Sequence, residues 1–186
     1  MTTGEDLIYH QVFTLKDGSR VLVRPIALED RQSLLDLFLP IKKQEQQYFR
    51  KNVKDPSVIE SWLDPQDFKS MLPLVAIVEG AAAGVAMLCF HQGSARHRAD
   101  VRIFVAAEYR QLGLGTRMIA GLIELARRRG LHILEVEVAA DQTNMLKTFC
   151  NLGFQDICTL ADYFISHDGS FQDVHLLVLH LPCHNG

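Results

Sequence analysis

The stretch that decides the fold is Tyr109-Arg110-Gln111-Leu112-Gly113-Leu114-Gly115-Thr116, which lies between two apolar segments. Before it, Val101 to Ala107 is almost wholly apolar and predicts a strand, whereas Met118 to Arg129 predicts an amphipathic helix. Backbone N–H groups at the start of a helix lack partners within the helix, so together with the helix dipole they favour an anion. Gly113 and Gly115 carry no Cβ, which lets a phosphate approach the backbone closely. An ordinary tight turn explains the two glycines equally well, and both interpretations stay open at this point.

The spacing of this turn does not fit two familiar phosphate-binding loops. No Lys followed by Ser or Thr comes after Gly115, so a Walker-type nucleotide loop is unsupported. The stretch has only two glycines, whereas the dinucleotide-binding motif has three. The turn therefore predicts an anion site of another kind.

Length and composition indicate one globular domain over residues 1–186. Hydrophobic residues make up 48% of the chain and the net charge is −3, so neither disorder nor a nucleic-acid partner is expected. The polar, acidic first six residues do not resemble a secretory signal. The long apolar window from Leu72 to Phe90 is broken by Glu79-Gly80, which favours two buried strands over a membrane span. We expect a cytoplasmic protein.

The cysteines and histidines predict no metal site. The four cysteines form no Cys-x-x-Cys pair and are expected to be reduced thiols. The histidines are scattered along the chain, so only folding could bring them together. The residues concerned are Cys89, Cys150, Cys158 and Cys183, with His91, His97, His167, His175 and His180.

Periodicity and turn residues predict the remaining elements. Asp17-Gly18 between two alternating segments predicts a hairpin, and residues 1–15 are expected to contribute an extra N-terminal strand. Pro40 ends a helical stripe that begins after Glu29-Asp30. The expected order is strands at 12–15 and 20–26, helices at 29–39, 42–51 and 56–63, strands at 74–78, 83–90 and 100–106, helix 118–129, strand 133–138, helix 143–152, and strands at 154–159 and 174–181.

Four aromatic residues lie in the helical region that precedes the central strands. They would either line a substrate groove or anchor two helices on the sheet, and the second role is the more common one for such side chains. They are Tyr48, Phe49, Trp62 and Phe68.

This order of elements is that of an α/β fold with a mixed central β-sheet flanked by helices. Arg110-Gln111-Leu112-Gly113-Leu114-Gly115 resembles the Arg/Gln-x-x-Gly-x-Gly/Ala motif of the GNAT superfamily, the acetyl-CoA-dependent N-acetyltransferases. The opening from Asp17 to Asp30 and the element from Asn144 to Gly153-Phe154 resemble the same family. The opening also resembles, more weakly, the bacterial protein-lysine acetyltransferase branch. The resemblance covers essentially the whole chain and implies the GNAT fold.

The resemblance also implies how acetyl-CoA is bound. Backbone N–H groups of the glycine turn would hold the pyrophosphate, and the pantetheine arm would pair with the strand before the turn. The N–H of Phe104 would bind the thioester oxygen, which gains negative charge during attack. Asn144 would contact the pantetheine arm, and the alternative role of an Asn here is a helix N-cap. The implied cofactor-binding residues are Phe104, Val105, Arg110, Gln111, Leu112, Gly113, Leu114, Gly115, Thr116 and Asn144.

Asp100 is the predicted general base. An amine acceptor such as lysine has a pKa of about 10.4 and arrives protonated, so a carboxylate must take up a proton. The family's protein-acetylating branch has a glutamate where this chain has Asp100, and pairing with Arg98 or Arg102 is the structural alternative.

Phe149 stands where many members have the tyrosine that protonates the leaving thiolate. Cys150 beside it is expected to be a core residue and not a nucleophile.

The predicted function is transfer of an acetyl group from acetyl-CoA to a primary amine, such as a protein lysine, by direct attack in a ternary complex. No metal is expected, and a homodimer is among the expected assemblies. Two alternatives stay open: an acyl-CoA-binding module without activity, and an acetyltransferase of small amines.

The segments from Lys42 to Phe68 and from Tyr163 to Phe171 are expected to shape the acceptor site. Their acidic residues suit a cationic acceptor, although a solvated surface explains them equally; they are Glu45, Glu60, Asp64, Asp162 and Asp168.

Overall fold

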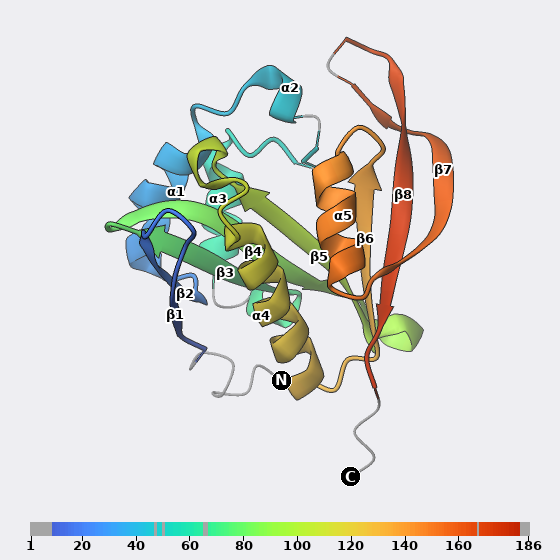
Figure 1. The fold of residues 1–186 in the computed structure, drawn as a ribbon, viewed down its shortest axis with the longest axis horizontal. Coiled ribbons are helices and arrows are strands. Elements are labelled where there is room, and N and C mark those ends of the chain that lie inside the picture. The colour runs from blue at the N-terminus through green and yellow to red at the C-terminus, as the bar shows by residue number, and fades with distance from the viewer. Residues whose placement is uncertain (1–8, 47, 50, 65–66, 167, 183–186) are drawn as a thin grey trace.

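One mixed sheet organises the molecule. The computed structural model describes residues 9–182, apart from 47, 50, 65–66 and 167. Eight strands lie in the order β1-β2-β3-β4-β5-β6-β8-β7, which confirms the expected mixed α/β architecture (Figure 1). The strands are β1 (Gln11–Thr14), β2 (Arg20–Pro25), β3 (Met71–Val78), β4 (Ala81–Phe90), β5 (Arg98–Val105), β6 (Ile133–Ala139), β7 (Gln155–Ile165) and β8 (Phe171–His180).

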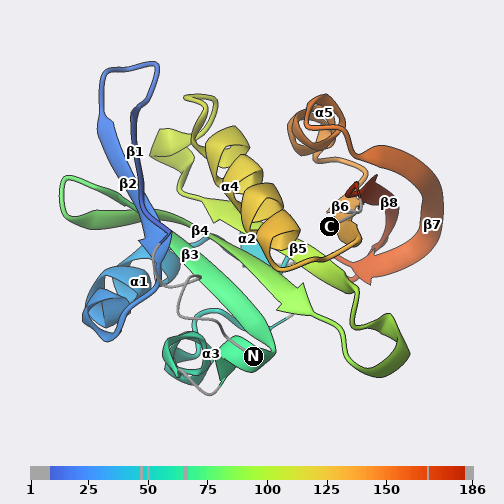
Figure 2. The same cartoon turned by 90° about the horizontal axis from the view of Figure 1, so that it is seen from below.

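Helices cover both faces of the sheet. Figure 2 shows α4 and α5 on one face and α1 and α3 on the other. Each face has its own apolar core, one built on α4 and the other on α1 and α3. The helices are α1 (Arg31–Phe38), α2 (Lys43–Gln46), α3 (Pro56–Leu63), α4 (Leu114–Arg128) and α5 (Thr143–Asn151).

The helix predicted over 42–51 is wrong, because α2 makes only one turn. All four residues of α2 are polar and none is buried, so no packing against the core supports further turns. In contrast, α3 has the expected bounds. The Asp55 side chain accepts a hydrogen bond from the backbone N–H of Ser57 (2.9 Å), and Pro56 occupies the first helical position.

The apolar window forms β3 and β4, as expected. Glu79 and Gly80 have φ values of 50° and 84°, which reverse the chain between the two strands. None of the helices in the described ranges is long and apolar enough to cross a membrane. The extra N-terminal strand corresponds to β1, and residues 1–8 lie outside the described residues.

The loop expected at 163–171 is shorter than predicted, because β7 continues to Ile165 and β8 begins at Phe171. Strand β7 lies at the edge of the sheet, with Ile157, Tyr163 and Ile165 exposed. An edge strand offers unpaired backbone groups to another chain. The homodimer itself stays a prediction.

Strands β5 and β6 separate in the middle of the sheet. They are the only parallel neighbours among the described strands, and their register contains just three pairs, Arg98↔Ile133, Ala99↔Leu134 and Asp100↔Glu135. Beyond these pairs the two strands diverge toward the glycine turn (Figure 1). Backbone groups along the end of β5 therefore face a gap in the sheet.

Candidate functional site

The glycine turn leaves the start of α4 open. Gly113 is the N-cap residue with φ 95°, a left-handed conformation that glycine adopts without strain. The backbone N–H of Arg117 donates to Gly113 O (3.1 Å) at the start of α4, and no side chain caps the helix. The N–H groups of Leu114, Gly115 and Thr116 therefore project from the N-terminus. Helix α4 begins four residues before the expected Met118, so both glycines belong to its start.

Three contacts hold the turn in place. The backbone N–H of Lys16, in the β1–β2 hairpin, donates to Leu112 O (3.3 Å). The Nε of Arg110 donates to Val105 O (2.9 Å), and its Nη2 lies 2.7 Å from Glu45 Oε1. The turn is thus tied to the hairpin, to the end of β5 and to α2.

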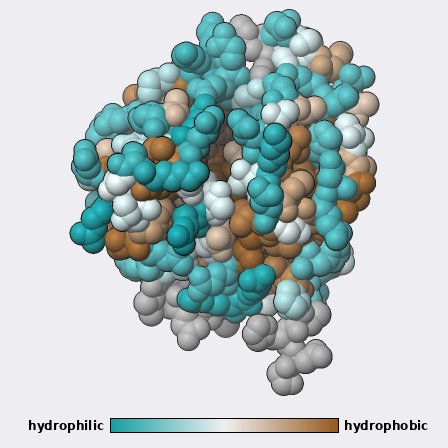
Figure 3. Space-filling view, in the orientation of Figure 1, coloured by the Kyte–Doolittle hydropathy of each residue, from teal (hydrophilic) through white to brown (hydrophobic). Residues whose placement is uncertain are grey.

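A pocket of about 440 Å³ lies where β5 and β6 diverge. Figure 3 shows this side of the molecule with a hollow between hydrophilic margins. Five predicted residues line the pocket: Asp100, Phe104, Val105, Arg110 and Asn144. Residues 111–116 do not line it and lie beyond Arg110, so an extended ligand is needed to reach both the turn and the pocket.

The backbone of Phe104 does not face this pocket, contrary to the sequence prediction. In the β4–β5 register Phe104 lies opposite Val85. Backbone hydrogen bonds join β4 and β5 on either side of this pair, from His91 N–H to Arg98 O (3.2 Å) and from Ala106 N–H to Ala83 O (3.0 Å). Arg98 and Ala106 both lie an even number of residues from Phe104. Because backbone groups alternate in direction along a strand, the N–H of Phe104 points toward β4.

The residues that direct N–H groups toward β6 are consequently Ile103 and Val105. The bond that Val105 O accepts from Arg110 shows that its backbone faces this side. Ile103 has the same parity and also lines the pocket.

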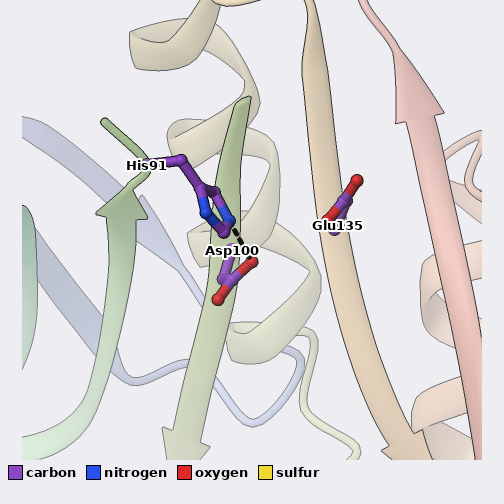
Figure 4. Close-up of side chains that lie close together, drawn as sticks. All are labelled: His91, Asp100 and Glu135. Carbon is purple, nitrogen blue, oxygen red and sulfur yellow. Dashed lines mark hydrogen bonds and ion pairs between the residues drawn. The ribbon is translucent and has the colours of Figure 1, made fainter. Parts of the chain in front are cut away.

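Asp100 belongs to a cluster of charged side chains from three neighbouring strands. Its Oδ1 lies 2.8 Å from Nε2 of His91, which follows β4 directly (Figure 4). Arg98 Nη2 lies 2.6 Å from Glu135 Oε2 on β6. The structural alternative, pairing of Asp100 with Arg98 or Arg102, is wrong, because Asp100 pairs with His91 and Arg98 pairs with Glu135.

The same cluster has the residue types of a metal site. Ligand atoms of His91, Asp100 and Glu135 all lie within 4.8 Å of one another. However, Arg98 already neutralises Glu135, and His91 already bonds to Asp100. A metal ion would have to displace both interactions, so the arrangement fits hydrogen bonding between these side chains better than metal binding.

Carboxylates on β6 and beyond were not predicted as site residues. Glu135, Glu137 and Asp141 all line the pocket. Glu137 Oε1 accepts a hydrogen bond from the Tyr163 hydroxyl (3.3 Å), and Asp141 Oδ2 accepts one from the Tyr48 hydroxyl (2.8 Å). The signal was present in the sequence, because alternate residues of a strand share a face.

The predicted packing role is observed for Phe49, Trp62 and Phe68, and three of the four aromatic residues also line the pocket. Tyr48, Phe49 and Trp62 line the pocket. Phe49 and Trp62 also pack edge-on against Phe38, with ring centroids 5.9 and 5.3 Å from it. Phe68 is buried in the core built on α1 and α3 and is not among the pocket residues.

Comparison with known proteins decides the family. The model of the acetyltransferase (GNAT) family matches residues 33–154, which is more than half of the chain. The chain belongs to the GNAT acetyltransferase family. The acetyl-CoA-dependent N-acetyltransferase expected from the glycine turn, with acetyl-CoA as co-substrate, is thereby confirmed.

Three GNAT relatives show the extent of the similarity. An acetyltransferase of Pseudomonas aeruginosa, PA5475, is 27% identical over 151 residues, which is 78% of this chain and 80% of that protein. The structure of yncA, a putative acetyltransferase from Salmonella typhimurium with its cofactor acetyl-CoA, gives a TM-score of 0.76 at 17% identity and covers 89% and 96% of the two chains. The GNAT domain of S. lividans PAT gives 0.74 at 20% identity and covers 92% and 97%. At these identities the two structures establish the GNAT fold.

Three residues of α5 bear on the sequence predictions. Asn144 is the second residue of α5 and lines the pocket, but the N-cap is Gln142, so the predicted capping role of Asn144 is wrong. Phe149 is fully buried and packs edge-on against Phe154 with ring centroids 5.0 Å apart. The expectation that Cys150 lies in the core is also wrong, because Cys150 is exposed. In this GNAT protein the position where many members have a tyrosine holds a core residue that also lines the pocket.

Proposed function

We propose that this GNAT acetyltransferase transfers the acetyl group of acetyl-CoA to a cationic primary amine by direct attack in a ternary complex. The observation that carries the proposal is the gap between β5 and β6. Backbone groups of β5 face the gap from one side, and the carboxylates of β6 face it from the other. This arrangement suits an extended thioester beside a positively charged acceptor.

The donor would lie along β5, starting from the glycine turn. The N–H groups of Leu114, Gly115 and Thr116 would bind the pyrophosphate at the N-terminus of α4. The pantetheine arm would extend back along the open side of β5, where the backbone of Val105 faces it. Ile103 lies farther from the turn, so its N–H would donate to the thioester oxygen in place of Phe104.

The acceptor would approach from the β6 side. Glu137 and Asp141 would attract the ammonium group, and Asp100 would take its proton. Asp100 lies three residues from Ile103, roughly 10 Å along the strand, so a water molecule would relay the proton. The free amine would then attack the thioester carbon, the thiolate of CoA would leave, and the second proton of the amine nitrogen would pass to the thiolate or to solvent. With a thiol pKa of about 8.5, this leaving group departs without a dedicated acid.

The nature of the acceptor follows from the pocket only as a class. A cationic amine is favoured by the carboxylates, whereas Tyr48, Phe49 and Trp62 would contact an apolar part of the molecule. A protein lysine has both properties, since its ammonium group ends a chain of four methylene groups. Small amines with an apolar part have them too.

The test is a screen of acceptors for release of free CoA thiol from acetyl-CoA. The screen should include lysine-containing proteins and peptides, free amino acids, polyamines and aromatic amines. We expect thiol release with cationic primary amines above the rate of hydrolysis without an acceptor. Tight binding of acetyl-CoA without release by any of these amines would contradict the proposal and would favour the acyl-CoA-binding module.

A further inference from the structure

We propose that His91 is a positioning residue for the general base, which it holds by a hydrogen bond from Nε2–H to Asp100 Oδ1. The inference rests on the proposed function, because it assigns a role within the same site. Its starting point is the 2.8 Å separation of these two atoms (Figure 4).

The two side chains occupy different places relative to the pocket. Asp100 lines the pocket, whereas His91 is not among the lining residues. Both side chains are partly shielded, with exposed fractions of 34% for His91 and 24% for Asp100. His91 therefore reaches the carboxylate from outside the pocket and leaves Oδ2 for the acceptor side.

The hydrogen bond matters because an aspartate side chain has few restraints of its own on a strand. A carboxylate that accepts a proton through a relayed water must keep one oxygen in line with that water. A carboxylate only accepts hydrogen bonds, so the imidazole nitrogen that faces Asp100 must carry the proton. The bond thus fixes both the carboxylate and the tautomer of the neutral ring.

The neighbours of the pair act on its charge but do not replace the bond. Glu135 lies within 4.8 Å of both groups, on the β6 side, and Arg98 neutralises it at 2.6 Å. Cys89 lies opposite Asp100 in the β4–β5 register. Within the part of the chain that the structure describes, the hydrogen bond from His91 is the only side-chain hydrogen bond to Asp100.

The first experiment compares two substitutions with thiol release as the readout. His91→Leu keeps the approximate bulk and removes the donor, so kcat/KM should fall about tenfold or more while the Kd for acetyl-CoA stays unchanged. His91→Gln places an amide N–H near the position of Nε2 and should retain activity within about threefold of the parent. Equal losses of kcat/KM in His91→Leu and His91→Gln would overturn the proposal that His91 acts by donating a hydrogen bond to Asp100.

A double variant tests whether His91 acts through Asp100. Because the positioning role disappears without the carboxylate, Asp100→Asn/His91→Leu should be no slower than Asp100→Asn alone. A further loss in the double variant would contradict the proposal. Activity of the parent with any amine confirms the acetyltransferase independently, so failure of this inference is distinguishable from failure of the proposed function.

The chain provides a matched control. His175 Nδ1 lies 2.7 Å from Asp156 Oδ2 on β8 and β7, and neither residue lines the pocket. His175→Leu removes the same kind of pair and should leave kcat/KM within about twofold. A loss equal to that of His91→Leu would show that any such pair matters only for folding.

A spectroscopic measurement needs no turnover. Long-range ¹⁵N–¹H correlation spectra of the neutral imidazole should show His91 in the Nε2–H tautomer in the parent. Asp100→Leu removes the acceptor and should release this preference, while the tautomer of His175 stays unchanged. A His91 ring in the Nδ1–H tautomer in the parent would overturn the proposal.

Discussion

The two strands that form the pocket offer different chemistry to a ligand. Strand β5 is packed on both faces, with Val101 in the core under α4 and Phe104 in the aromatic cluster of α1 and α3, so its open side offers mainly backbone groups. Strand β6 presents carboxylates at Glu135 and Glu137. Backbone groups serve a donor that is common to the family, whereas side chains can change with the acceptor. Under the proposed function, β5 would bind acetyl-CoA, which is common to the family, and β6 would help to choose the acceptor.

The largest expected effect comes from Asp100, the one carboxylate that β5 contributes to the pocket. Asp100→Asn keeps the size of the side chain but removes its basicity. Turnover should fall about 10²-fold, the usual scale of general-base catalysis, while the Kd for acetyl-CoA stays unchanged. The loss should shrink at high pH, where more of the acceptor amine is already neutral. A pH–rate profile of both proteins checks this, and near-normal turnover of the variant at pH 7 would exclude Asp100 as the base.

A second prediction concerns Phe149, a residue of α5 that lines the pocket. Phe149→Tyr adds a hydroxyl to a fully buried side chain, and a buried hydroxyl without a partner costs about 1–3 kcal/mol. We therefore expect lower stability in chemical denaturation and no gain in turnover. Phe171→Tyr is the control, because the Phe171 side chain is 63% exposed. Unchanged stability with faster turnover would mean that the hydroxyl reaches the pocket and protonates the leaving thiolate.

The glycine turn of the proposed acetyl-CoA site could be predicted from the sequence. Two glycines between an apolar strand and a helix predicted an anion site at the start of α4, although the helix begins at Leu114 and not at Met118, and Pro56 predicted the start of α3. Local conformation determines these features, so local sequence reveals them.

The carboxylates of the proposed acceptor site and the N–H groups of β5 that face the pocket could not be predicted, because both depend on strand pairing. The parity that turns the N–H of Phe104 toward β4 follows from the β4–β5 register, which the loop after Phe90 sets. The same register brings His91 to Asp100, and the divergence of β5 from β6 exposes Glu137. A shift of one residue would redirect all of these groups, and no local pattern excludes such a shift.

A third prediction tests the start of α4. An added Cβ at Gly115 would lie 3.7 Å from both Ile103 Cδ1 and Val105 Cγ2, so it points toward β5 and not toward a bound pyrophosphate. Gly115→Ala should therefore be tolerated, whereas the branched side chain of Gly115→Val should press α4 away from β5. We expect the valine variant to bind acetyl-CoA about tenfold more weakly, which corresponds to about 1.4 kcal/mol. Calorimetric titration of both folded variants checks this. Equal affinities for acetyl-CoA would contradict binding of the pyrophosphate at the start of α4.

The smallest expected effect concerns Glu137 and tests the role of β6 directly. Glu137→Gln keeps the shape of the side chain and an acceptor for the Tyr163 hydroxyl, but removes the charge. If this carboxylate attracts the ammonium group, KM for a cationic acceptor should rise about fivefold, which corresponds to about 1 kcal/mol. The turnover number should stay within about twofold. The difference between the two proteins should narrow at high salt, because the pocket is open to solvent and its charges are screened.

Two comparisons separate a charge effect of Glu137 from a general disturbance of the pocket. An aromatic amine that is neutral at the assay pH should show the same KM in both proteins, since it carries no charge for Glu137 to attract. Glu60→Gln removes an exposed carboxylate that pairs with Arg31 away from the pocket, so it should leave every KM unchanged. If KM rose equally for the neutral and the cationic amine, Glu137 would act through the shape of the pocket. Acceptor choice would then lie with the aromatic residues around Tyr48 and Phe49, and the division of labour between β5 and β6 would be wrong.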